Sequence, residues 1–188
     1  MDLEIPEGSL VVLVGPAGCG KSTFAARHFR ATEVLESDAF RAMVADDPAD
    51  LKATPDAFEV LHLVAAKRLA AGRLTVVDAT NVLPRARKPL VELARRYHRV
   101  PVAVVFDLPE RICQQWNRQR ERTVPRQTIH RHTGQLRRSL GTLLGEGLPG
   151  GARPRLAGGD RPGRGDPPAH VGPAQRGERA GRPRLVTG

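Results

Sequence analysis

The chain of 188 residues has two cysteines and a formal net charge of +10, which is divided as −1 over residues 1–110, +7 over residues 111–144 and +4 over residues 145–188. This length predicts one domain with a core of its own, and two cysteines argue against the disulfide framework of a small secreted protein. The acidic start and the lack of a long apolar run argue against a signal peptide and a membrane span, so we expect a cytoplasmic protein that does not enter a membrane.

The most specific motif is the stretch Leu10–Thr23, LVVLVGPAGCGKST. An apolar strand leads into G-x-x-x-x-G-K-[ST], the pattern of a phosphate-binding loop, and a helix is expected to follow. Chance alone produces such a match in about one chain of this length in a hundred. Lys21 is expected to reach the outer phosphates, and the Ser22 hydroxyl to bind Mg²⁺. We therefore predict an ATP site formed by Gly15, Pro16, Ala17, Gly18, Cys19, Gly20, Lys21, Ser22 and Thr23.

A short strand is expected over residues 32–36, and the pattern Ser37-Asp38-x-x-Arg41 follows it. A carboxylate at this place can act as general base, because it can accept the proton of a hydroxyl that attacks the γ-phosphate. Arg41, one helical turn further on, can hold an anionic group of the acceptor. The alternative is an aspartate that caps the helix expected over residues 39–44, with a surface arginine. The position beside the phosphate loop favours the catalytic interpretation.

Residues 54–78 predict a helix and then a buried strand. The pair Thr54-Pro55 is a good helix start, and Gly72 is a good stop. The strand expected over residues 74–78 is apolar and ends in Asp78, which we expect near Mg²⁺ through a water molecule. The alternative is a turn at the end of the strand, made by Asp78 and Asn81.

The alternation of strands and helices continues to about residue 140. It predicts an α/β domain of the P-loop NTPase type, with a parallel sheet and helices on both faces. Ligands of such sheets bind beyond the carboxyl ends of the strands, where Gly15, Asp38, Asp78 and Asp107 all fall. The remaining expected elements are a helix over residues 89–97, a strand over 102–107 and helices over 109–120 and 127–140.

The stretch 117–122, NRQRER, is expected to form a lid over ATP. Phosphoryl transfer requires positive groups around the transferred phosphate, and Arg118, Arg120 and Arg122 supply guanidinium groups. The alternative is a solvated basic helix face, which explains most arginine runs. Three arginines of the last expected helix are candidates for contacts with an acceptor backbone instead, namely Arg131, Arg137 and Arg138.

The composition changes near Gly145. Residues 145–188 contain 12 Gly, 7 Pro and 8 Arg among 44 residues. Such a segment has too little apolar surface to offset the entropy of ordering it. We therefore expect a domain over residues 1–147 and a disordered tail over residues 148–188.

Residues 1–147 resemble the N-terminal kinase domain of bacterial polynucleotide kinase–phosphatase, an enzyme of an RNA end-healing and sealing system. The resemblance is carried by GPAGCGKSTFA, SDxxR, AFEVLHxxAAKRLAAGRLTVVDATNV, ARKPLxELARxYH, PVAVVFDLPE and NRQR. It implies ATP- and Mg²⁺-dependent phosphorylation of a nucleic-acid 5′-hydroxyl end, with RNA as the favoured acceptor. It also implies that Lys21 and Ser22 contact the phosphates and Mg²⁺, Asp38 acts as general base, Arg41 faces the acceptor and the lid arginines contact ATP.

Two features depart from the pattern of that family. Trp116 stands where the family has an arginine before the Asn-Arg pair. The family chain continues after E-G-F with a further core strand and then with phosphatase and ligase domains, whereas Glu146–Leu148 leads into a Gly/Pro/Arg-rich segment here. We therefore expect that the final edge strand is missing, and that residues from about 148 onward are foreign to the fold, as a frameshift in a GC-rich gene would produce.

Two other functions stay open at the level of sequence. One is a small-molecule kinase with the same fold, although the +7 segment favours a polyanionic acceptor. The other is a non-catalytic nucleotide- or RNA-binding remnant of a truncated enzyme, which the altered C-terminal segment suggests.

Overall fold

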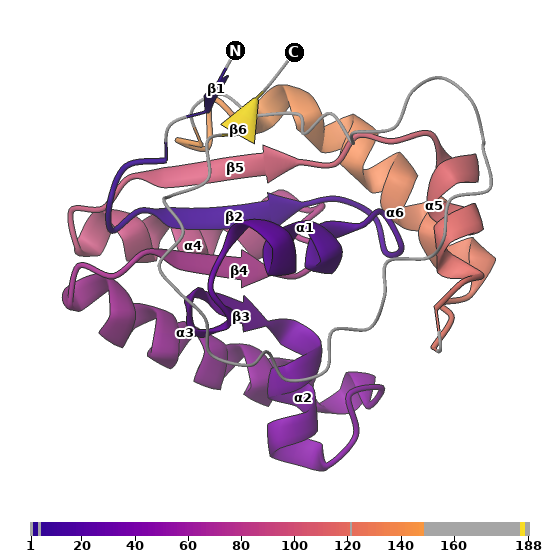
Figure 1. Cartoon of the computed structure of the whole chain (residues 1–188), viewed down its shortest axis with the longest axis horizontal. Coiled ribbons are helices and arrows are strands. Elements are labelled where there is room, and N and C mark those ends of the chain that lie inside the picture. Colours follow the sequence, from indigo (N-terminus) through magenta and orange to yellow (C-terminus); the bar gives the residue numbers. More distant parts are fainter. Residues whose placement is uncertain (1, 4, 121, 149–184, 187–188) are drawn as a thin grey trace.

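A parallel sheet of four strands forms the centre of the protein, in the order β3-β4-β2-β5 (Figure 1). The strands β2 and β4 are buried along their whole length, which fits the continuous apolar runs of a parallel sheet covered on both faces. Within residues 5–120 and 122–148, no strand is paired to the outer side of β5. The strands are β2 (Leu10–Val14), β3 (Val34–Glu36), β4 (Thr75–Asp78) and β5 (Pro101–Val105).

Helices cover both faces of this sheet, which confirms the predicted α/β class. Phe24 of α1 packs on one face beside Val76 of β4, and Leu61 of α3 and Leu90 of α4 pack on the other face beside Val77. Alternate residues of one strand thus enter two separate cores, as the pleat of a strand requires. The helices are α1 (Lys21–His28), α2 (Ser37–Ala45), α3 (Thr54–Ala70), α4 (Pro84–Arg96), α5 (Glu110–Asn117) and α6 (Arg126–Ser139), with the 3-10 turns η1 (Ala31–Glu33), η2 (Leu51–Ala53) and η3 (Leu140–Thr142).

One helix boundary differs clearly from the prediction. The helix expected to begin at Pro89 begins at Pro84, and Pro89 lies inside it. Pro84 suits the start of a helix because the first N–H groups have no partner within the helix. Pro89 is exposed, so water can reach the carbonyl group that loses its bond there. A single proline was therefore a misleading sign of the helix start.

The computed structural model describes residues 2–3, 5–120, 122–148 and 185–186. The predicted disordered tail lies outside these residues except for Leu148, Leu185 and Val186. Leu148 is fully buried in the same core as Leu61 and Leu90. The strands β1 (Asp2–Leu3) and β6 (Leu185–Val186) pair with each other in antiparallel fashion, apart from the main sheet. None of the helices described here is long and apolar enough to cross a membrane.

Candidate active site

The predicted phosphate-binding loop lies between β2 and α1. Gly18 and Gly20 have φ angles of 76° and 85°, a region that favours glycine because it has no Cβ atom. A Cβ atom at Gly18 would lie 2.8 Å from the carbonyl oxygen of Cys113, and one at Gly20 would lie 3.2 Å from Cζ3 of Trp116. The loop therefore turns tightly against α5.

The segment after β4 holds the start of this loop in place. The N–H group of Gly15 donates to the carbonyl of Thr80 at 2.9 Å, and Nδ2 of Asn81 donates to the carbonyl of Leu13 at 2.9 Å. Asn81 is 1% exposed and has a φ angle of 47°, a conformation that asparagine tolerates better than most residues. The end of β4 and the phosphate-binding loop thus form one hydrogen-bonded unit.

Lys21 lies inside the loop. Its Nζ atom donates to the carbonyls of Gly15 at 3.1 Å and Pro16 at 2.7 Å, and only 8% of the residue is exposed. Cys19 lies 3.6 Å away through its Sγ atom. Burial raises the pKa of the Cys19 thiol, although the charge of Lys21 acts in the opposite direction. The thiol therefore stays protonated at neutral pH.

Asp78 lies beside Lys21 and Ser22 at the start of α1. The residue is 4% exposed, and the Ser22 side chain lies close enough to its carboxyl group to lower the pKa of that group. Its Oδ2 atom is buried and finds no hydrogen-bond partner among the described residues. Burial raises the pKa of Asp78, while the charge of Lys21 and the bond from Ser22 oppose this rise.

A hydroxyl and an unpartnered carboxylate oxygen fit Mg²⁺, which takes oxygen ligands and is usually bound by one or two carboxylates together with substrate phosphates. In the described part of the chain, no group of three or more His, Cys, Asp or Glu residues is arranged to hold a metal ion. The residues around Ser22 and Asp78 therefore suit an ion that arrives with the phosphates of a nucleotide, and they do not form a complete metal cage.

Asp38 lies in the first turn of α2, with 41% of its side chain exposed. Nη2 of Arg41 donates to its Oδ1 atom, and Arg41 is fixed by a second bond from Nε to the carbonyl of Pro48 at 2.9 Å. Nη1 of Arg122 lies 3.7 Å from Oδ2 of Asp38. The fold thus brings together Asp38, Arg41 and one arginine of the predicted lid.

The three predicted lid arginines are placed differently. Arg122 contacts Asp38, and the charge of Arg120 acts on the carboxylates of Glu36 and Asp78, whose pKa values it lowers against the larger effect of burial. Arg118 is exposed at the end of α5, and the described residues show no contact between its side chain and these carboxylates. The geometry therefore favours Arg120 and Arg122 over Arg118 as groups that face the site.

Glu36 is a residue of this site that sequence reasoning missed. It is the last residue of β3 and the direct partner of Asp78 in β4. Burial raises its pKa, and the carboxylates of Asp78 and Asp38 raise it further. The residue lay inside a predicted strand, but strand prediction did not show which strand would lie beside it.

A second missed residue, Arg87 of α4, supports the site through Asn81, the residue that holds the start of the phosphate-binding loop. It is fully buried, and its Nε and Nη2 atoms donate to Glu146 at 2.7 and 2.6 Å. Its Nη1 atom donates to the carbonyl of Asn81 at 2.8 Å. This network connects the last turn of the described domain to the segment that anchors the phosphate-binding loop. In the sequence, Arg87 is one of several basic residues in this stretch, and nothing indicated that it would be buried in such a network.

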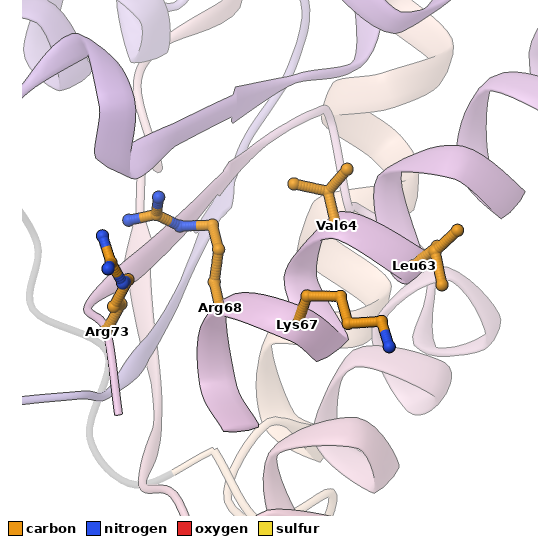
Figure 2. A pocket seen from close by; sticks show the side chains of 5 residues that line it. All are labelled: Leu63, Val64, Lys67, Arg68 and Arg73. Atoms are coloured by element: carbon orange, nitrogen blue, oxygen red, sulfur yellow. The ribbon is translucent and has the colours of Figure 1, made fainter. Parts of the chain in front are cut away.

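A hollow of about 440 Å³ lies elsewhere, beside the end of α3 (Figure 2). Arg68 lines it and donates to the carbonyl of Leu74, just before the start of β4. Since Asp78 is at the other end of β4, this hollow lies at the amino end of the sheet. Its other lining residues are Leu63, Val64, Lys67 and Arg73.

Comparison with known proteins identifies the family. Residues 10–141 match the family AAA_33, which is described as an AAA domain. The chain belongs to this AAA domain family. The matched residues run from the start of β2 to η3, so they contain the whole four-stranded sheet and every site residue discussed above from Gly15 to Arg122. No curated protein matches the AAA domain described here.

Among solved structures, the AAA domain resembles one titled as the Pnkp1/Rnl/Hen1 RNA repair complex, with 24% identity and a TM-score of 0.63 over 74% of this chain and 47% of the other. A second structure of the Pnkp1/Rnl/Hen1 complex gives 24% identity and a TM-score of 0.52 over 65% and 42% of the two chains. The chain thus spans less than half the length of these two relatives. A gluconokinase from Sinorhizobium meliloti 1021 matches more weakly, with 19% identity and a TM-score of 0.46 over 70% and 77% of the two chains. The feature shared with the two Pnkp1/Rnl/Hen1 structures is the P-loop kinase-like fold.

Proposed function

We propose that this protein is a polynucleotide 5′-hydroxyl kinase that transfers the γ-phosphoryl group of ATP to the 5′-hydroxyl end of a nucleic acid, with RNA as the favoured acceptor. The observation that carries the proposal is the position of Asp38. Its carboxylate is partly exposed, lies beside Arg41 and Arg122, and is close enough to Asp78 to raise the pKa of that residue. A hydroxyl group that reaches Asp38 therefore lies next to the phosphate-binding loop.

The nucleotide half of the proposed reaction uses the loop and α1. Backbone amides of residues 17–23 bind the phosphates, and Lys21 exchanges its bonds to the loop carbonyls for bonds to the outer phosphates. Ser22 and Asp78 would hold Mg²⁺, which neutralises charge on the phosphates when it is bound. These residues orient ATP and reduce the negative charge around the γ-phosphorus that the acceptor oxygen attacks.

The acceptor half uses α2 and the loop after α5. The oxygen of the acceptor hydroxyl attacks the γ-phosphorus, its proton passes to the Asp38 carboxylate, and the bond from the γ-phosphorus to the ADP oxygen breaks. Arg41 holds Asp38 and faces the acceptor. Arg120 and Arg122, with Arg118 at the edge of the lid, balance the charge of the phosphoryl group during transfer.

Two observations support a nucleic acid as the acceptor. Residues 111–144 carry a charge of +7, and Arg126, Arg131, Arg137 and Arg138 of α6 are exposed, as contacts to a phosphate backbone require. The similar structure with the TM-score of 0.63 is also titled as an RNA repair complex. We further propose that the protein works in a reducing cytoplasm, because both cysteines are free thiols.

The decisive experiment is transfer of labelled γ-phosphate from ATP to 5′-hydroxyl RNA and DNA oligonucleotides of the same sequence. The expected result is Mg²⁺-dependent labelling of the 5′ end and no labelling of an oligonucleotide that already carries a 5′-phosphate. Asp38→Asn is expected to lower the rate by a factor of about 100 or more while ATP binding is retained. Asp56→Asn, at an exposed position of α3, is the matched control and should leave the rate unchanged.

Other outcomes would overturn the proposal in distinct ways. Labelling of sugars or nucleosides, but not of oligonucleotides, would indicate a small-molecule kinase. Binding of ATP without transfer to any acceptor would indicate a non-catalytic nucleotide-binding protein. Full activity of Asp38→Asn would show that Asp38 is not the general base.

A further inference from the structure

Two carboxylates face each other at the ends of neighbouring strands. Glu36 and Asp78 are direct partners in the register of β3 and β4. Two residues earlier, Val34 and Val76 both pack into the core under α1, whereas Leu35 faces the opposite core. Because side chains alternate along a strand, Glu36 and Asp78 both project toward α1 from strands that lie roughly 4.8 Å apart.

This arrangement is unfavourable unless a positive charge joins it. Like charges directly opposite each other destabilise a pair of strands, and Asp78 is 4% exposed, so water screens its charge poorly. The Asp78 Oδ2 atom has no hydrogen-bond partner in the described residues, and Glu36 makes no capping bond to the start of α2. The pair therefore retains free oxygen atoms beside Ser22.

Two protein cations near this pair, Lys21 and Arg41, are engaged with other groups, and a third, Arg120, acts on it only from an exposed position where water screens its charge. Lys21 donates to the carbonyls of Gly15 and Pro16, and Arg41 donates to Asp38 and Pro48. In the proposed reaction, Lys21 turns to the phosphates of ATP, so it would not neutralise both carboxylates during catalysis. A divalent cation is the remaining positive charge that this reaction brings to the site.

We propose that Glu36 is a second carboxylate of the cation site, which holds Mg²⁺ together with Asp78 and Ser22 on the face of the sheet that α1 covers. The inference rests on the proposed ATP-dependent function and extends it to a residue outside the phosphate-binding loop and the SDxxR element.

The proposal predicts opposite effects of one substitution with and without metal. Glu36→Gln removes a negative charge but keeps the size of the side chain. In the full chain, it is expected to weaken Mn²⁺ binding to the complex with adenylyl imidodiphosphate by about tenfold, measured by electron paramagnetic resonance. Without metal, the same variant should bind this ATP analogue as tightly as the wild type or more tightly, because one carboxylate fewer repels the phosphates.

Glu59→Gln, at an exposed position of α3, is the matched control and should leave both affinities unchanged. A purely structural role of Glu36 would weaken analogue binding equally with and without metal, and this result would overturn the inference. Unchanged Mn²⁺ affinity in Glu36→Gln would do so as well. The measurement uses no acceptor, so a wild-type protein that binds Mn²⁺ and the analogue but does not label oligonucleotides would count against the proposed function alone.

Discussion

The side-chain amide of Asn117 is paired with the main chain of Val124 through two hydrogen bonds. Nδ2 donates to the carbonyl of Val124 at 2.8 Å, and the N–H group of Val124 donates to Oδ1 at 2.9 Å. Asn117 is 6% exposed and ends α5, so these bonds close the loop that carries Arg120 and Arg122 and fix both of its ends. The two hydrogen bonds that hold this loop thus depend on one side-chain amide group.

We predict that Asn117→Ala loosens this loop. Two main-chain groups of Val124 lose their partners, which is expected to lower the free energy of unfolding by about 1–3 kcal/mol. Phosphoryl transfer should slow more than ATP binding weakens, because Arg120 and Arg122 are needed most during transfer. Asn117→Asp can still accept from the N–H group of Val124. Its stability and its rate of transfer should therefore lie between those of the wild type and those of Asn117→Ala. Urea unfolding and steady-state kinetics measure both effects, and equal behaviour of the two variants would contradict the role of the amide.

Loss of Glu146 is expected to destabilise the domain strongly. Glu146→Ala leaves the fully buried guanidinium of Arg87 without its charge partner, which should cost about 3 kcal/mol of unfolding free energy. The matched control is Glu92→Ala, since Glu92 is exposed and lies 3.9 Å from Lys88 at the surface. That control should change stability by less than about 0.5 kcal/mol in urea unfolding. Similar losses of unfolding free energy in both variants would show that the buried ion pair stabilises the fold no more than the exposed one.

The same pair makes stability depend on pH. Burial alone raises the pKa of Glu146, but the hydrogen bonds from Arg87 and Thr142 and the charge of Arg87 outweigh it, and the pKa falls below its ordinary value of 4.5. A carboxyl group with a lowered pKa stabilises the folded state fully above the unfolded-state value, and this contribution is lost as pH falls through the folded-state pKa. Unfolding free energies measured from about pH 6 to about pH 3 should therefore fall less steeply in Glu146→Gln than in the wild type.

Gly18→Ala is expected to abolish nucleotide binding. The backbone conformation alone costs about 1–2 kcal/mol for a residue with a Cβ atom, and the new atom would lie 2.8 Å from the Cys113 carbonyl oxygen, so the loop must move. Gly141→Ala is the control, because no described atom lies within 4 Å of a Cβ at that position. Calorimetric titration with ATP distinguishes them, and normal binding by Gly18→Ala would show that the loop rearranges freely.

Trp116 should report on nucleotide binding. It is the one tryptophan of the sequence, and its Cζ3 atom would lie 3.2 Å from a Cβ atom at Gly20 of the phosphate-binding loop. Phosphates that enter the loop change the field and the packing around the indole, so ATP is expected to change its fluorescence in a saturable way. Lys21→Ala should remove this response at the same ATP concentrations. A response that persists in this variant would place the nucleotide elsewhere.

The sequence by itself determined the local parts of this protein. The phosphate-binding loop from Gly15 to Ser22 could be predicted because its glycines, lysine and hydroxyl residue act within one continuous segment. The α/β class followed from alternating strand and helix patterns, and the placement of Asp38 and Asp78 at strand ends followed from the same patterns. Even so, the start of α4 was missed, because a proline suits both the first turn and an exposed interior position of a helix.

Only the tertiary structure decided which distant residues meet. Glu36 and Asp78 are partners because β3 lies beside β4 in that register, and the residues of each strand alone do not specify its neighbour. Arg87 and Glu146 are 59 residues apart in the chain, and their bond forms because α4 and the end of the domain pack on the same face of the sheet. Periodicity in a sequence assigns a side chain to a face, but the contacts across that face depend on how whole elements pack.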